Sequence, residues 1–195
     1  DPRKAPPRER YPLAWEQRAV LQAEAIADMG TAFNLPHEID LAPEVSLSRL
    51  RAAVAALVRR HAALRTGILP DGDDWVMCPL DPARATPALD IQPIDHPAGT
   101  APAAPIRPFH PDGGPLARWS LHRDPAGRLV LFFDIHHSMA DAQAVDILLG
   151  DLAALYAGRT LAPVAVDVVD YGWWTATRDQ AAVDQARDWW RQIFP

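Results

Sequence analysis

The chain has 195 residues, of which 49% are hydrophobic and 23% are charged, and this composition is typical of one globular unit with a single core. A formal net charge of −6 argues against a nucleic-acid-binding surface, which needs a basic face, and no apolar run is long enough to cross a membrane. Cys78 is the single cysteine, which excludes a disulfide within the chain and suits a cytoplasmic location.

Residues 1–10 are charged, contain several prolines and lack the apolar core of a signal peptide, so we expect them to form a linker. The first helix is expected over residues 15–29, where apolar side chains recur on one face at helical spacing. Gly30 is expected to end this helix. The side chains of its apolar face are Trp15, Ala19, Ile26 and Met29.

A strand region is expected over residues 33–41, followed by a second helix with Ser46 as its N-cap. Residues 68–77 predict a hairpin that turns at 71–73. Half of the chain's 20 prolines lie in residues 79–115, and because proline lacks a backbone donor this stretch predicts loop and edge strand. The apolar face of the second helix is expected to comprise Leu47, Leu50, Val54, Leu57 and Val58.

Two apolar runs, residues 116–121 and 129–135, predict a second hairpin with its turn at 124–127. A third helix is expected from Asp141 to about Ala157, and a final helix over residues 171–193. The inward side chains of the third helix are expected to be Val145, Leu148, Leu149, Leu152 and Tyr156.

Two adjacent histidines, His136 and His137, close the second apolar run of that hairpin. The ordinary pKa of histidine is the closest to neutral, so these side chains are the first candidates for holding or moving a proton. In an extended strand adjacent side chains point to opposite faces, so the two imidazoles cannot coordinate the same metal ion. We therefore expect no metal site here.

Asp141 has two structural interpretations. Aspartate is a favoured N-cap, which places Asp141 just before the third helix. Alternatively, Ser138 begins the helix, and Asp141 lies in the first turn, where the helix dipole favours a carboxylate.

The stretch HHSMADA at residues 136–142 resembles the HHxxxDG motif of the condensation domains of non-ribosomal peptide synthetases, within the chloramphenicol acetyltransferase-like superfamily. Further motif-like segments follow the order known for that family and extend the resemblance to almost the whole chain. They are PLAWEQ (12–17), RHAALRT (60–66), PFHPDGGPLAR (108–118), DYGWW (170–174) and WWR (189–191).

The resemblance implies an α/β (α+β) two-layer sandwich, with helices packed on one side of a mixed sheet. It implies that residues 11–195 are the N-terminal lobe of a condensation domain, whose C-terminal lobe is absent from this chain. The implied reaction is amide bond formation between substrates on the 4′-phosphopantetheine arms of donor and acceptor peptidyl carrier proteins. No cofactor bound by the lobe itself is implied, and residues 1–195 alone are expected to be inactive.

The same resemblance implies a role for each motif residue. His137 is the expected catalytic residue, in contact with the acceptor amine or the reaction intermediate, and His136 is expected to support the backbone. Asp141 is expected to be held by an arginine, either Arg65 or one outside this chain. Ala142 stands where the family has glycine, so we expect either a strained backbone or a narrower tunnel.

Three other functions stay open. One is a stand-alone acyltransferase that uses coenzyme A or a carrier-bound acyl group, and another is a non-catalytic docking or recruitment module of the same fold. The third is an epimerase-like activity. The clustered tryptophans are expected to be core or lobe-interface anchors rather than ligand-stacking groups; they are Trp173, Trp174, Trp189 and Trp190.

Overall fold

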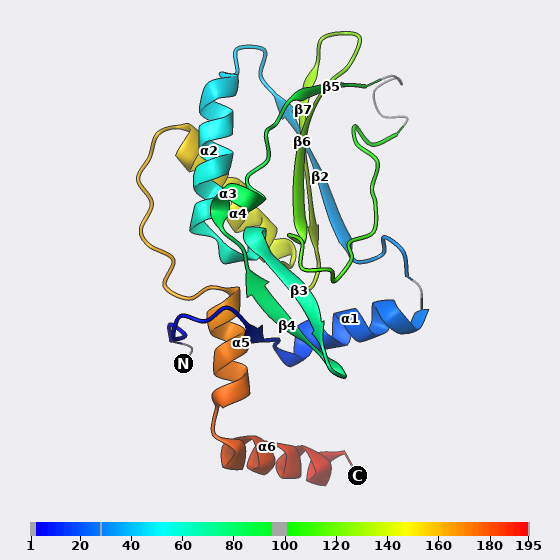
Figure 1. Cartoon of the computed structure of the whole chain (residues 1–195), viewed down its shortest axis with the longest axis vertical. Helices are drawn as coiled ribbons and strands as arrows, with labels where there is room; N and C mark the ends of the chain where they lie inside the picture. Colours follow the sequence, from blue (N-terminus) through cyan, green and yellow to red (C-terminus); the bar gives the residue numbers. More distant parts are fainter. Residues whose placement is uncertain (1–2, 28, 95–100, 195) are drawn as a thin grey trace.

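The computed structural model describes residues 3–27, 29–94 and 101–194, and the structural statements below concern these residues (Figure 1). The larger of the two sheets that they form is mixed, with strand order β2-β7-β6-β5. Its pairs are antiparallel except for the short edge strand β5, which runs parallel to β6. The strands are β2 (Asn34–Leu41), β5 (Ile91–Pro93), β6 (Ala117–Arg123) and β7 (Leu129–His136).

A smaller antiparallel sheet has the order β1-β4-β3. Gly72 has a φ of +65° in the turn between β3 and β4, a conformation that glycine adopts without strain, and the hairpin predicted at residues 68–77 is confirmed. The strands are β1 (Tyr11–Pro12), β3 (Thr66–Asp71) and β4 (Asp74–Pro79).

Two long helices, α2 (Leu47–Arg60) and α4 (Ala142–Tyr156), lie side by side along the larger sheet (Figure 1). They share one apolar core with alternate residues of β7, while on the opposite face Ile94 and Ala103 pack with Val130. β7 is consequently buried on both faces. Helices on one side of a mixed sheet confirm the predicted fold class. The shared core includes Val54, Leu57, Leu131, Phe133, Ile135 and Leu148.

Helix α1 (Trp15–Ala27) forms where expected, but the prediction of its inward face was wrong. Trp15 is 63% exposed and Ile26 is 87% exposed, whereas Gln17 and Leu21 are buried. The helix turns a partly polar face inward because Gln17 has hydrogen-bonding partners there that are distant in the sequence.

The single final helix predicted over residues 171–193 was also wrong, because the structure has two helices, α5 (Val168–Thr177) and α6 (Gln180–Ile193). Asp179 caps α6 by accepting a hydrogen bond from the N–H of Ala181, and this cap begins a new helix. Helix α6 has no buried residue among those described, so its two tryptophans are not part of this core, and their role as lobe-interface anchors stays a prediction. Trp189 is 52% exposed and Trp190 is 54% exposed.

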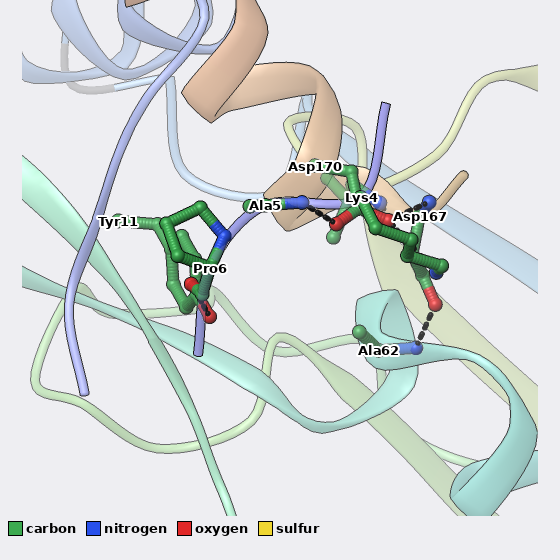
Figure 2. A network of polar contacts seen from close by, with 8 residues as sticks. Lys4, Ala5, Pro6, Tyr11, Ala62, Asp167 and Asp170 are labelled. Atoms are coloured by element: carbon green, nitrogen blue, oxygen red, sulfur yellow. Dashed lines mark hydrogen bonds and ion pairs between the residues drawn. The ribbon is translucent and has the colours of Figure 1, made fainter. Parts of the chain in front are cut away.

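The N-terminal segment lies against α5 (Figures 1 and 2). Asp170 accepts hydrogen bonds from Nζ of Lys4 at 2.9 Å and from the N–H of Ala5 at 2.8 Å. The hydroxyl of Tyr11 donates to the carbonyl of Pro6, and Tyr11 begins β1. Residues 4–11 therefore tie α5 to the smaller sheet. The domain boundary expected at residue 11 stays a prediction.

Candidate active site

A cleft of about 770 Å³ opens beside the end of β7. Its walls come from α1, from the turn that follows β7, from α4 and from the segment that leads into α5. Apolar side chains such as Val20, Met139 and Leu148 line much of it, together with polar and charged side chains.

His137 and His136 lie on opposite sides of the chain at the end of β7. His137 is exposed and lines the cleft, and its backbone N–H donates to the carbonyl of Phe33 at 2.8 Å. His136 is 1% exposed and lies between the rings of Phe33 and Phe109 on the other face of the strand. The two imidazoles therefore do not converge on a common ligand.

The environment of His136 keeps its ring neutral. Burial, followed by the nearby charge of His137, lowers the pKa of His136 to about 4. Its Nδ1 lies 2.8 Å from Oγ of Ser138. A neutral, buried ring in this position supports the turn and has no access to the cleft.

The turn of residues 138–140 is buried and holds His137 at the mouth of the cleft. The carbonyl of Ser138 accepts a hydrogen bond from Nε2 of Gln17 at 2.9 Å, and the N–H of Met139 donates to the carbonyl of His136 at 2.8 Å. Gln17 also accepts from the N–H of Ala14 through Oε1. One side chain of α1 therefore fixes this turn to the start of its own helix.

Asp141 is the N-cap of α4, and Oδ1 accepts a hydrogen bond from the N–H of Ala144 at 2.7 Å. The alternative start of the helix at Ser138 was therefore wrong. Ala142 is the first residue of α4 and is exposed, and its φ is not in the left-handed region. Of the two expected consequences of alanine at this position, the strained backbone is therefore absent.

The structure does not bring Arg65 to Asp141, so this predicted pairing was wrong for the described residues. Nη1 of Arg65 instead donates to the carbonyl of Leu80 at 3.0 Å, and the N–H of Leu80 donates back to the carbonyl of Arg65. Arg65 lies at the start of β3, so its side chain follows the hairpin rather than the cleft.

The cleft is also lined by a tyrosine and a glutamate that the sequence interpretation did not single out. The hydroxyl of Tyr171 donates to Oε1 of Glu16 at 2.9 Å. This hydrogen bond is the main reason that the pKa of Tyr171 is raised above its ordinary value, and burial adds to it. Both residues lie within or beside motif-like segments, which is the only sequence signal that could have identified them.

The lining also includes a charged cluster formed by Arg60, His61 and Asp151. Nε of Arg60 lies 2.7 Å from Oδ2 of Asp151, and Nε2 of His61 lies 2.8 Å from the same oxygen. Burial acts to raise the pKa of Asp151, but the hydrogen bonds from Arg60 and His61 outweigh it and hold that pKa below its ordinary value. Asp151 is therefore ionised at neutral pH.

His137 is thus a histidine that is open to an apolar cleft, next to a buried neutral histidine. Such an imidazole can accept a hydrogen bond or a proton from a group bound in the cleft. Within the described ranges, no three His, Cys, Asp or Glu side chains are grouped so as to hold a metal ion.

The chain matches the family described as Condensation domain over residues 7–195. It belongs to the condensation domain family. The resemblance seen in the motifs is thereby confirmed, and the neighbours in sequence are peptide synthetases. The chain is 31% identical over 197 residues to tyrocidine synthase 2 of Brevibacillus parabrevis, covering 97% of this chain and 5% of that protein. It is 30% identical over 164 residues to surfactin synthase subunit 1 of Bacillus subtilis (strain 168), covering 84% of this chain and 4% of that protein.

Solved structures show the same fold. The X-domain from teicoplanin biosynthesis superposes with a TM-score of 0.72 at 24% identity, over 95% of this chain and 41% of that one. The first condensation domain of the calcium-dependent antibiotic synthetase, in complex with a substrate analogue, gives a TM-score of 0.67 at 22% identity, over 95% and 47%. This condensation-domain chain therefore spans less than half of these structures, about the size of one lobe. None of the helices described here has the length and apolar character needed to cross a membrane.

Proposed function

We propose that residues 11–195 are the N-terminal lobe of a condensation domain that forms an amide bond between two carrier-bound substrates, with His137 as its catalytic residue. The observation that carries the proposal is the position of His137: it is the exposed histidine beside the turn that α1 and β7 hold in place, and it faces the cleft. His136, Asp141 and Ala142 shape this turn, and Arg65 takes no part in it.

The proposed reaction uses the lone pair of an acceptor amine. The amine nitrogen attacks the thioester carbonyl of the donor, so a C–N bond forms, and the C–S bond then breaks to release a thiol. His137 accepts a hydrogen bond from the amine, which orients it toward the carbonyl, and the same imidazole can take the proton that the nitrogen must lose. The leaving thiolate gains a proton in turn, so the step is balanced without an oxidant or reductant.

The proposed partners are donor and acceptor peptidyl carrier proteins, whose phosphopantetheine arms present the two substrates, and a second lobe that completes the tunnel. We also propose that the lobe binds no cofactor of its own and works in the cytoplasm, where its free Cys78 would stay reduced. Residues 1–195 alone are then inactive, and amide formation by this purified fragment would refute that part of the proposal.

The test is amide formation by the complete condensation domain with loaded donor and acceptor carriers. His137→Ala is expected to lower kcat by about 100-fold or more, the range of a lost proton-transfer or orienting group. Gln92→Ala is the control, because Gln92 is an exposed residue of the edge strand β5 and does not line this cleft. Turnover by His137→Ala within about twofold of the unmodified domain would overturn the catalytic role.

A docking module of the same fold is the second candidate. The observation that favours it is the similarity to the X-domain in its complex with OxyB from teicoplanin biosynthesis, with a TM-score of 0.73 over 95% of this chain. In that case His137→Ala leaves product formation by the native producer unchanged, whereas deletion of residues 11–195 abolishes it. A loss of product with both changes would exclude a purely docking role.

A further inference from the structure

The protonation of the His136 ring follows from its contacts. The backbone N–H of Ser138 donates to Nδ1 of His136 at 3.3 Å, and the Ser138 hydroxyl lies 2.8 Å from the same nitrogen. Nδ1 is therefore an acceptor, and because the ring is neutral, its proton is on Nε2.

Nε2 of His136 faces the carboxyl group of Glu24 on α1. The distance from Nε2 to Oε2 of Glu24 is 3.2 Å, and the side chain of Glu24 is 18% exposed. Oε2 of Glu24 lies at hydrogen-bond distance from Nε2, but in the described part of the chain no acceptor is aligned with the Nε2 proton, so a small rotation of either side chain is needed to form the bond. Burial raises the pKa of Glu24 above its ordinary value, and the charge of His110 partly offsets this rise. Glu24 and His136 therefore meet in a place from which water is largely excluded.

Glu24 and Gln17 lie seven positions apart, so both project from one face of α1, two turns from each other. Gln17 holds the backbone of the turn through the carbonyl of Ser138. Glu24 reaches the ring of His136, which binds the same turn through Nδ1. Helix α1 therefore contacts the chain on both sides of His137, the residue that enters the cleft. Gln17 contacts Ser138, and Glu24 contacts His136.

We infer that Glu24 is a positioning residue for His137: its carboxyl group holds the Nε2-protonated ring of His136, and that ring fixes the turn that presents His137 to the cleft. This inference rests on the proposed function for its effect on turnover. Its structural part, the state of the His136 ring, stands without it. Glu24 itself does not line the cleft and so does not touch the reacting groups.

The test compares three substitutions in the complete condensation domain. Glu24→Met keeps the size and helical preference of the side chain, suits the apolar neighbours Leu21 and Phe109, and removes the acceptor. Glu24→Gln keeps an oxygen that can accept from Nε2. Gln22→Ala is the matched control, because Gln22 is an exposed residue of the same helix.

Glu24→Met is expected to lower kcat by about tenfold with KM within about twofold, because a misplaced catalytic group slows the chemical step. Glu24→Gln and Gln22→Ala are expected to keep kcat within about twofold. An unchanged kcat in Glu24→Met, or an equal loss in Glu24→Gln, would overturn the inference. Thermal unfolding of each variant identifies a loss that comes from misfolding.

Nitrogen-15 NMR of labelled histidine gives a readout that does not depend on turnover. The His136 ring is expected to be protonated at Nε2 alone and to stay neutral down to about pH 4. Glu24→Met is expected to keep the proton on Nε2, because the N–H of Ser138 still donates to Nδ1, but to shift the Nε2 resonance, and Glu24→Gln is expected to preserve that resonance. A ring protonated at Nδ1 in the unmodified domain, or a ring that Glu24→Met leaves unaltered, contradicts the inference. Absence of amide product from the unmodified domain contradicts the proposed function, and the NMR result then decides the structural part by itself.

Discussion

The imidazole of His61 donates a hydrogen bond to Oδ2 of Asp151, 2.8 Å away, and so joins the end of α2 to α4 in the wall of the cleft. Arg60 shares that oxygen and also donates from Nη1 to the carbonyl of Ala162, in the segment that connects α4 to α5. The carboxylate of Asp151 therefore joins α4 to the end of α2, and Arg60 extends this link to the segment before α5. Its removal tests how far this wall depends on charge.

Asp151→Asn is expected to lower the free energy of unfolding by about 1–3 kcal/mol at neutral pH, the usual value of hydrogen bonds to a charged group. The pKa of Asp151 is lowered in the folded state, so its ionised form favours folding. That contribution is complete above the unfolded-state pKa of about 4 and is lost as the pH falls through the lower folded-state pKa. Urea unfolding from pH 7 down to acid should therefore show the two proteins converging below about pH 4.

Asp188→Asn is the control for this experiment. Asp188 lies 3.6 Å from Arg191 on α6, and both side chains are exposed, so this pair should contribute little. A gap between Asp151→Asn and the unmodified protein that persists unchanged in acid would show that charge is not the cause.

The N-terminal segment supplies a second prediction. The carboxylate of Asp170 is buried and accepts from Lys4, from the N–H of Ala5 and from the N–H of Asp167 (Figure 2). Asp170→Asn places an amide N–H₂ against at least one of these donors, so we expect a loss of about 2 kcal/mol or more in the free energy of unfolding. Urea unfolding at neutral pH measures it.

Lys4→Met is the comparison, because it removes the cation and leaves both backbone donors in place. The Lys4 side chain is 60% exposed, so its ion pair with Asp170 is screened, and the expected loss is about 1 kcal/mol or less. An equal loss in the two variants would mean that the ion pair, rather than the backbone donors, holds the segment on α5.

Most helices and strands were predictable because their apolar residues recur with a clear period. Helix α2 shows this well: Ser46 caps it, and Leu50, Val54 and Leu57 are buried as expected. The inward face of α1 was not predictable in this way. Gln17 is buried there by its bonds to the turn after β7, more than a hundred positions away, and apolar periodicity carries no information about such partners.

The candidate site was predictable in part. Strand alternation predicts that His136 and His137 point to opposite faces, and the motif selects His137 as the one that enters the cleft. The sequence could not show that Arg65 and Asp141 lie apart, because their distance depends on where the hairpin of β3 and β4 directs the side chain of Arg65. The break between α5 and α6 was not predictable, because an aspartate such as Asp179 also occurs within helices. Only its hydrogen bond from the N–H of Ala181 identifies it as a cap.

Ala142 leads to a prediction about activity. It is exposed at the first position of α4 and its φ is not in the left-handed region, so nothing in the structure requires glycine there. Ala142→Gly in the complete condensation domain should leave turnover within about an order of magnitude and lower the free energy of unfolding by at most about 1 kcal/mol. Amide formation with loaded carriers is the measurement. A larger gain in turnover would show that alanine impairs this copy of the motif.

Two helical glycines provide a pair of substitutions with opposite expected signs. A Cβ at Gly172 of α5 would overlap the carbonyl oxygen of Pro12 and would lie 2.5 Å from Cε of Met77, because α5 packs directly on β1 and β4. Gly172→Ala should therefore force these elements apart and lower the free energy of unfolding by about 1–3 kcal/mol. A Cβ at Gly150 of α4 meets nothing within 4 Å.

Gly150→Ala is accordingly expected to raise the free energy of unfolding by up to about 1 kcal/mol, because alanine loses less backbone freedom in a helix than glycine does. Urea unfolding of both variants under one set of conditions makes the comparison direct. The decisive result is the sign: a Gly172→Ala protein as stable as Gly150→Ala would show that α5 does not pack against β1 at the distance seen in the structure. Proteolysis of the N-terminal segment in Gly172→Ala should also become faster, since the same displacement separates Asp170 from Ala5.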